Sequence, residues 1–411
     1  MSTPGIRHEA FFAALGKLPE DNPRWPSLLA ALVTLRLIDE WLGTHHVPVE
    51  MLAAVHTTLD TVPAHDPSRT LVGDLLTPIA RGDPPEFRTV VAPLLAYAHW
   101  LRTNAHWALA NDVYTTVWQE LISSSRTTGA ELDDATDAAL VAGMCRRNMG
   151  EPRDAEDAYD AARILASERG DEIRERRAQL GLAKVAQMRG NLPAAEDALH
   201  DIIANTTDPK FADVRAHAYH DLGVALFWRE EYDAALQAYY KALVCPQDPQ
   251  ERMRVISDIG GVLGELGFVD FARIADRLVW EQCTDIGVRG VAGVNLIELA
   301  RLDRNESEFE RYRALVRDIL AQLPMKTHVD YYYALGLGFE TFGDTDRALE
   351  HYDHAIEIAE SHGLGQELYR IDCARDTVAD GLSNVVDNAP PAALPSVVPL
   401  GEALENLAAA R

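Results

Sequence analysis

A repeated order of small residues, glycine, alanine and tyrosine is the pattern that most restricts how this chain can fold. Five segments share a central alanine, and these alanines are separated by 40, 40, 37 and 76 residues. They are Ala155, Ala195, Ala235, Ala272 and Ala348. The widest interval holds one degenerate segment, at about 291–321, and a further degenerate unit precedes the first alanine. A period near 40 residues is typical of repeats that stack in one direction.

The residue types in this pattern predict pairs of helices. A glycine between two apolar helical stretches ends the first helix, because glycine adopts a left-handed conformation at little cost. The small residues allow the two helices of a unit to approach closely. Strand signals are nearly absent from the chain, and apolar residues recur at helical spacing. Since no single unit buries its own apolar face, we expect the units to stack into an all-α solenoid.

Two units carry the pattern most clearly, at 219–243 and 332–358. Their residues are Leu222-Gly223, Tyr232, Ala235, Tyr239 and Ala242 in one, and Leu335-Gly336, Gly343-Asp344, Ala348, Tyr352 and Ala355 in the other. This order resembles the tetratricopeptide repeat (TPR) family. The units exceed that family's ~34 residues, and in this they are similar to bacterial TPR-based peptide-sensing regulators such as the Rap proteins. The resemblance implies a right-handed superhelical solenoid of TPR-like helix-turn-helix repeats with an N-terminal helical bundle.

The chain divides into four expected regions. Residues 1–86 do not fit the repeat and are expected to form an N-terminal helical bundle or degenerate repeats, with helices near 6–17, 26–43, 48–62 and 69–81. The TPR-like solenoid is expected at 87–361, with a polar insert at 122–134. A capping helix is expected at 362–387. A Pro-rich linker and short C-terminal helix are expected at 388–411.

The charge of the chain restricts its partners. Lys and Arg total 38 and Asp and Glu total 64, so the net charge is −26. This balance argues against binding to nucleic acid or to an anionic membrane. The four cysteines show no metal-binding spacing, and we expect reduced thiols. The N-terminal segment lacks an apolar signal sequence and no apolar run is long enough to span a bilayer, so a cytoplasmic location is expected.

Motifs for catalysis, cofactors and metals are weak. The glycine-rich stretches 259–264 and 335–338 fall inside predicted helices, whereas a phosphate-binding loop needs a preceding strand. The pairs His217/His220 and His351/His354 share helix faces but have no third ligand by spacing. We therefore predict no enzyme activity, no cofactor and no metal site.

The concave surface of the solenoid is the candidate site, because the first helix of each TPR unit lines that surface in the family. The resemblance places the following candidate groove residues there: Arg147, Asn148, Arg177, Lys184, Gln187, His217, His220, Phe227, Trp228, Arg254 and Tyr333. Arg and amide groups can hold a peptide backbone or a carboxylate, and the aromatic rings offer contact area. Further expected neighbours are Met144, Leu180, Val224, Ser257, Leu337 and Glu340. The alternative interpretation is an ordinary solvated helix face.

Three functional hypotheses follow. The first is a scaffold or adaptor that binds a peptide or an extended protein segment in the groove. The second is a peptide-responsive regulator resembling the Rap proteins, in which the N-terminal bundle acts on a protein target. The third is a self-assembling protein whose C-terminal tail inserts Leu404 and Leu407 into its own groove or that of a neighbour, giving a homo-oligomer.

Overall fold

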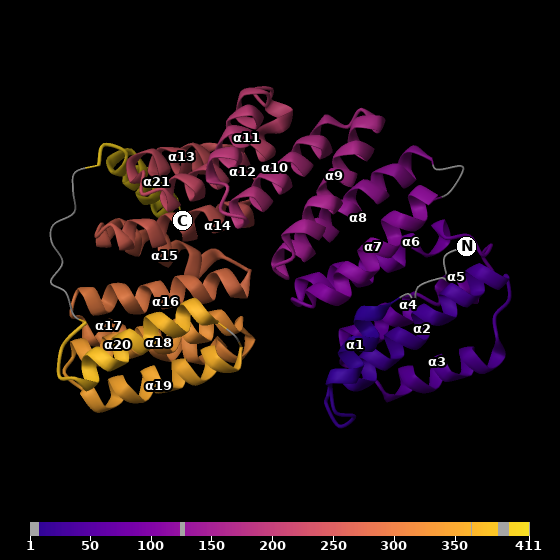
Figure 1. The fold of residues 1–411 in the computed structure, drawn as a ribbon, viewed down its shortest axis with the longest axis horizontal. Helices are drawn as coiled ribbons and strands as arrows, with labels where there is room; N and C mark the ends of the chain where they lie inside the picture. Colours follow the sequence, from indigo (N-terminus) through magenta and orange to yellow (C-terminus); the bar gives the residue numbers. More distant parts are fainter. Residues whose placement is uncertain (1–7, 124–127, 363, 385–393, 411) are drawn as a thin grey trace. The chain divides into compact units, whose positions relative to one another are not determined.

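The structure is a computed structural model that describes residues 8–123, 128–362, 364–384 and 394–410. Within these ranges the chain forms 21 α-helices and two short 3-10 helices, and no strand. It divides into two compact units, residues 1–202 and 203–411, and each unit is described by itself. Figure 1 shows the order of the helices along the chain.

The first unit begins with five helices that precede the repeats. They are α1 (Glu9–Lys17), α2 (Trp25–Thr44), α3 (Val49–Thr61), α4 (Pro67–Asp74) and α5 (Thr77–Arg81). The predicted helix at 69–81 is therefore two helices, with a break at Leu75 and Leu76. Pro78 in the first turn of α5 explains the break, because proline suits a helix start but not a helix interior.

The rest of the first unit consists of helix pairs. These are α6 (Arg88–Thr103) with α7 (Trp107–Ser123), α8 (Gly129–Asn148) with α9 (Pro152–Arg169), and α10 (Glu172–Met188), followed by α11 (Leu192–Ala204), which crosses the unit boundary. The expectation of a polar insert at 122–134 is wrong for its second half, which starts α8. Thr128 and Glu131 form a reciprocal capping box there, so polar residues begin this helix.

The second unit holds four further pairs, with α20 packed on α19. The pairs are α12 (Ala212–Trp228) with α13 (Tyr232–Val244), α14 (Pro249–Glu265) with α15 (Val269–Gln282), α16 (Ile286–Leu302) with α17 (Glu306–Ile319), and α18 (Met325–Thr341) with α19 (Thr345–Ser361), followed by α20 (Gly365–Ala379). The 3-10 helices are Pro209–Phe211 and Leu320–Gln322. The first helices α14, α16 and α18 pack on one another in sequence (Figure 1).

Glycine takes the two roles that the sequence pattern predicts. Gly267 and Gly343 lie between paired helices with φ of 83°, in the left-handed region. Other glycines lie inside first helices where a ring packs on the backbone: a Cβ at Gly223 would come within 2.7 Å of Tyr239. Between α12 and α13 the left-handed residue is Glu230 instead, with φ of 63°. The turn is thus retained without its glycine.

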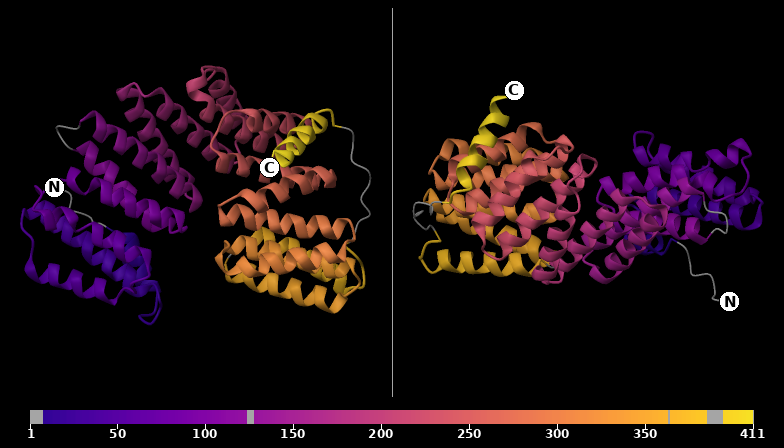
Figure 2. Two further views of the ribbon diagram at one scale, coloured as in Figure 1. Left: turned by 180° about the vertical axis from the view of Figure 1, so that it is seen from behind. Right: turned by 90° about the horizontal axis from the view of Figure 1, so that it is seen from above.

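The C-terminal helix α21 (Val397–Ala409) packs on α13 and α15, which are second helices of their pairs. The views of Figure 2 show it against this part of the second unit. Leu400 and Leu404 are fully buried, Gly401 lies against Phe271, and the Ser396 amide donates to Asp233 Oδ1 at 3.0 Å. The tail helix therefore lies on second helices. Insertion into its own groove, one form of the third hypothesis, is wrong, and insertion into a neighbour's groove stays a prediction. Part of the linker before it, 385–393, lies outside the described residues.

Two further expectations concern the cysteines and the absence of membrane-spanning helices. Cys145, Cys245 and Cys283 are buried free thiols and Cys373 is an exposed one. Among the described residues, none of the helices combines the length and the apolar character needed to cross a membrane.

Candidate ligand groove in the second unit

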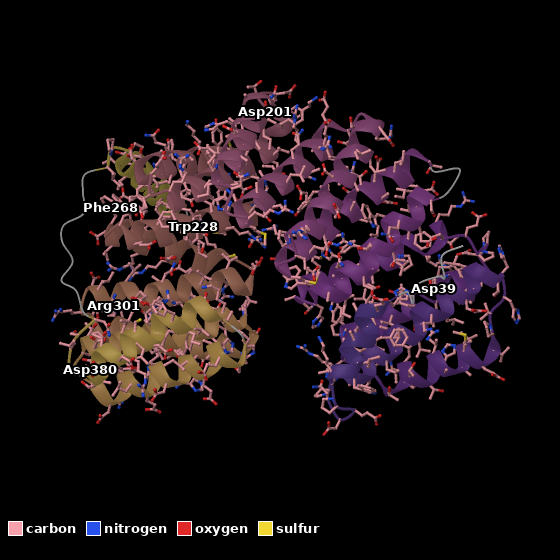
Figure 3. The ribbon with its side chains drawn as sticks, in the orientation of Figure 1. Asp39, Asp201, Trp228, Phe268, Arg301 and Asp380 are labelled. Atoms are coloured by element: carbon pink, nitrogen blue, oxygen red, sulfur yellow. The ribbon has the colours of Figure 1, made fainter. Side chains whose placement is uncertain are left out.

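A groove of about 720 Å³ opens along the first helices of the second unit. Its walls come mainly from α12, α14 and α16, and part of its floor comes from α15. The volume lies within the range of small-molecule and peptide side-chain sites. Trp228 and Arg301, both labelled in Figure 3, line it.

The floor of the groove holds a buried carboxyl group at a position that is a tyrosine in three other repeats. In three units a glycine of the first helix packs on a tyrosine sixteen residues later: Gly143 on Tyr159, Gly223 on Tyr239 and Gly336 on Tyr352. Sixteen residues after Gly260 stands Asp276, and a Cβ at Gly260 would lie 2.8 Å from its Oδ1. The smaller side chain leaves room that a tyrosine ring fills elsewhere.

Asp276 has one hydrogen-bond partner and one unpartnered oxygen. Its side chain is fully buried, and Oδ1 accepts a hydrogen bond from Asn295 Nδ2 at 3.1 Å. Oδ2 has no partner among the residues that the structure describes. Burial raises the pKa of Asp276 well above its usual value, although the Asn295 bond opposes this. A neutral carboxyl group can donate a hydrogen bond from the unpartnered oxygen to a carbonyl of a ligand.

Aromatic side chains form one wall of the groove. Phe227 and Trp228, at the end of α12, have ring centroids 6.2 Å apart, and Phe227 also lies 5.8 Å from the Tyr232 ring. Trp228 is 71% exposed. An exposed tryptophan beside a groove offers a large rigid surface for a ligand at little cost in conformational entropy.

Charged residues line the other side. Arg301 is bound to Glu298 at 3.1 Å, and burial raises the pKa of Glu298 although Arg301 opposes it. Arg370 from α20 pairs with Asp330 at 3.0 Å and stacks 4.4 Å from the centre of the Tyr333 ring. An adjoining pocket of about 310 Å³ shares Glu298 and Arg370 with the groove.

The predicted residues of the second unit fall in several places. Phe227 and Trp228 line the groove with their expected neighbours Val224 and Ser257, and Tyr333 lines the adjoining pocket. His217, His220 and Arg254 are held by carboxylates. His220 contacts Asp258 at 2.6 Å, Arg254 contacts Asp285 at 2.8 Å, and His217 lies 3.6 Å from Glu251.

Glu340 has a structural role in place of the expected groove position. Its carboxylate accepts hydrogen bonds from Ser383 Oγ at 2.8 Å, Asn384 Nδ2 at 3.0 Å and Tyr352 Oη at 3.1 Å. Burial would raise the pKa of Glu340, but these bonds outweigh it and lower the pKa. Glu340 thus holds the chain that follows α20.

The predicted residues of the first unit stay a prediction. Arg147 and Asn148 lie at the end of α8, where Asn148 Nδ2 donates to the Met144 carbonyl at 2.8 Å. Arg177, Lys184 and Gln187 lie on α10, Arg177 exposed and the other two half-buried. They belong to a different unit from the groove and are described apart from it.

The histidine pairs have partners other than metal ions. His351 stacks on Phe339 at 5.1 Å, and His354 meets the Tyr332 ring edge-on at 4.2 Å. Burial lowers the pKa of His351. In the described part of the chain, no group of three His, Cys, Asp or Glu side chains is placed to hold a metal ion.

The groove residues that sequence reasoning missed include Asp276, Asn295, Glu298, Arg301 and Arg370. For Asp276 a signal was present, because three of the five segments have a tyrosine four residues after the central alanine, whereas the Ala272 segment carries an acid there. Asn295 is the tenth residue of α16, and the tenth residues of α12 and α14 are Asp221 and Asp258, so the repeat pattern gave no signal for it. A carboxyl residue at a repeat position that holds a tyrosine in several other units is the signal to look for.

Comparison with solved structures identifies proteins of similar fold. The structure of the Rap conjugation gene regulator of the plasmid pLS20, in complex with the Phr* peptide, matches 84% of this chain and 98% of its own, with a TM-score of 0.54 and 14% identity. The chain has a Rap-like fold. A Rap protein complexed with competence and sporulation factor also aligns, over 86% of this chain and 98% of its own, at 9% identity and a TM-score of 0.45. No family model and no curated protein sequence matches the chain.

The Rap-like fold agrees with two expectations. The helices pack in sequential pairs, with a helical bundle preceding a TPR solenoid. The resemblance to Rap regulators, inferred from repeat length and residue order, is confirmed at the level of the fold. At 14% identity the match says nothing about which residues bind a ligand.

Proposed function

We propose that this chain is a peptide-responsive regulator that binds an extended peptide in the groove of its second unit. The observation that carries the proposal is the buried Asp276, whose Oδ2 lacks a partner within the described residues although it lies in a groove. A buried polar atom left unpaired costs roughly 1–3 kcal/mol, and a peptide carbonyl would remove that cost once the peptide displaces the side chains that cover Oδ2. The peptide-bound regulator of the same fold supports the class of ligand.

The groove offers complementary contacts for a short peptide. The half-buried Asn295 presents an amide on the floor for the backbone, with Asp276 beneath it, and Trp228 presents a surface for an apolar side chain. Arg301 and Glu298 lie on the other side, where they can pair with charged ends or side chains. Backbone contacts give affinity and the wall residues give sequence preference.

Retention of peptides by the full chain tests this assignment. A synthetic pool of random hexapeptides is passed over immobilised protein, and retained peptides are identified by mass spectrometry and titrated by fluorescence polarisation. Asp276→Tyr, which restores the repeat residue and fills the floor, should abolish retention. Trp228→Ala should weaken binding about tenfold or more.

The controls separate binding from folding. Tyr369→Ala removes a 74% exposed aromatic residue of the same unit that is not among those lining the groove, and should leave affinity unchanged. Trp228 is mostly exposed, so its variant should fold even if Asp276→Tyr does not. Unchanged affinity in Trp228→Ala, or the same peptides retained by Asp276→Tyr, would contradict the groove assignment.

The first hypothesis, a passive scaffold, differs from a regulator in what happens to the first unit. In a regulator, the bound peptide changes the N-terminal helices that would act on a protein target. Hydrogen exchange of α1 to α3 should therefore change when a retained peptide is added. Protection confined to residues 203–411 would favour the scaffold and would leave the groove assignment intact.

A further inference from the structure

A second cavity, of about 850 Å³, lies inside the first unit. It is bounded by α1, the start of α2, the turn at 63–68, the end of α6 and the start of α7. Its size falls within the usual range for small-molecule sites. Because it lies where the N-terminal helices meet the first helix pair, a ligand here would contact both.

The interior of this cavity is aromatic. The Tyr97 ring stacks on Phe11 at 6.4 Å and on Trp100 at 6.2 Å, with only 13° between the planes of Tyr97 and Trp100. Trp100 in turn lies 6.1 Å from His106. Trp100 is only half-buried although it lies at the centre of this row. Flat apolar surface of this kind binds an aromatic ring or an alkyl chain.

The rim of the cavity is cationic. Lys17 and Arg24 line it, both exposed, and neither has an ion-pair partner among the residues described. The only carboxylate in the lining is Asp66, whose oxygens accept hydrogen bonds from Ser27 Oγ at 2.7 Å and the Ser68 amide at 2.9 Å. In a chain with a net charge of −26, two such cations at one opening form a local excess of positive charge.

His106 of the lining does not add to that charge near neutral pH. Burial lowers the pKa of His106, and the nearby Arg24 lowers it further, so its ring is neutral. A neutral imidazole beside Trp100 extends the apolar wall and keeps one nitrogen available for a hydrogen bond. The cavity thus combines a largely aromatic interior with a positive opening.

We propose that this cavity is a second ligand site, for a small amphipathic carboxylate. The aromatic or alkyl body of the ligand packs on Trp100, and its carboxylate pairs with Arg24 and Lys17 at the rim. The charge complementarity at the opening selects an anion, and the apolar interior excludes small polar acids. This site is independent of the peptide groove, since all of its residues lie in the first unit.

Calorimetric titration of the full chain with matched acids and amides tests the proposal. The probes are indole-3-acetate and octanoate, each compared with its uncharged amide. We expect each acid to bind about tenfold more tightly than its amide. The double variant Lys17→Gln/Arg24→Gln should remove this difference, whereas Arg81→Gln, an exposed cation of the same unit outside the lining, should preserve it.

A second variant distinguishes loss of binding from loss of folding. Ala14→Phe places a ring into the cavity from α1 without adding charge, and should block both acids while circular dichroism and thermal unfolding stay those of the original protein. Trp228→Ala, in the other unit, should not change the binding of either acid. Equal affinity for acid and amide, absence of binding at millimolar concentration, or full binding to Ala14→Phe would each overturn the proposal.

Discussion

Asn295 Nδ2 donates a hydrogen bond to Oδ1 of Asp276 across 3.1 Å, and this bond joins α16 to α15 of the preceding helix pair. Asp276 stands where three other units have a tyrosine. Replacing that ring with a carboxyl group that hydrogen-bonds to the Asn295 amide gives the groove a polar floor where those three units have a closed apolar contact. A local departure from the repeat thus creates the chemistry of the site.

Asp276→Asn should stabilise the protein by an amount that increases with pH. The unfolded chain ionises this carboxyl near pH 4, whereas burial holds its pKa far higher in the folded state. Between those values the unfolded state releases a proton that the folded state keeps. The free energy by which Asp276 destabilises the folded state therefore rises by about 1.4 kcal/mol per pH unit. Asparagine does not ionise and so lacks this effect.

Urea unfolding at pH 5, 6 and 7 measures this difference. Asp270→Asn is the matched control, because Asp270 lies on the same helix with a 95% exposed side chain. Its difference from the original protein should stay constant over the same range. A constant difference for Asp276→Asn would show that Asp276 is ionised in the folded protein.

His8 should stabilise the first unit in acid and neutral solution and lose this effect in alkali. It is only 4% exposed and lies between Asp39 Oδ2 at 3.2 Å and Asp112 Oδ1 at 3.0 Å. Burial would lower the pKa of His8, but hydrogen bonds to Asp112 and Asp39 outweigh it and raise the pKa to about 9. The protonated ring therefore favours the folded state by about 3 kcal/mol below pH 6.5.

The variant His8→Gln should be less stable by most of that amount at pH 6. The deficit should shrink as pH rises from 6.5 through 9, because the folded-state imidazolium then loses its proton. The measurement is the urea midpoint of the first unit at pH 6, 7.5 and 9. His56→Gln, an exposed histidine of the same unit, should show no such trend. A deficit that does not vary with pH would contradict a charged His8.

Gly223→Ala should destabilise the second unit by about 1–3 kcal/mol. The added Cβ would lie 2.7 Å from the buried Tyr239 ring, which cannot move aside without disturbing α13. Gly264→Ala is the comparison, because its Cβ would meet Leu299 at 3.7 Å, an ordinary contact.

Alanine favours the helix interior over glycine, so Gly264→Ala should be neutral or stabilising by about 0.5–1 kcal/mol. Thermal unfolding of the two variants gives the comparison directly. Equal stability of both variants would mean that the glycine–tyrosine contact does not hold the helix pair together.

Leu404→Asp should release α21 from the second unit. Leu404 is fully buried against α13 and α15, so the change removes apolar burial and places a charge in that contact, at a cost of about 3–5 kcal/mol. Val398→Asp, at a 60% exposed position of the same helix, should have little effect. Limited proteolysis near residue 394 reports the release, and equal resistance of the two variants would contradict this packing.

The sequence was sufficient for the fold class because its information is local and repeated. The spacing of Gly223, Tyr239 and Ala242, and of their counterparts in other units, specifies which faces of each helix pair touch. The same helix–helix contact is encoded in each repeat. A single departure, such as Glu230 in place of glycine, therefore does not hide the repeat pattern. The sequence signals for helix starts are also local. Asp248, for example, caps α14, and Pro249 is the first residue of that helix.

The site was less predictable, since it depends on which side chains remain unsatisfied after packing. His220 and Arg254 looked available in sequence, yet Asp258 and Asp285 from neighbouring elements pair with them. Asp276 looked like one more surface acid in a chain rich in acids, yet the structure buries it completely. The C-terminal tail was recognisable as an amphipathic helix, but its partner helices were not.

By itself the sequence determined an all-helical chain of stacked pairs with a Rap-like order, because glycine turns and small-residue contacts act over one or two turns of helix. Only the tertiary structure decided which polar groups line the groove, which are neutralised in ion pairs, and where the tail helix packs. Those outcomes depend on distances between residues of different helix pairs, such as Asp276 and Asn295, and no single repeat encodes such a distance.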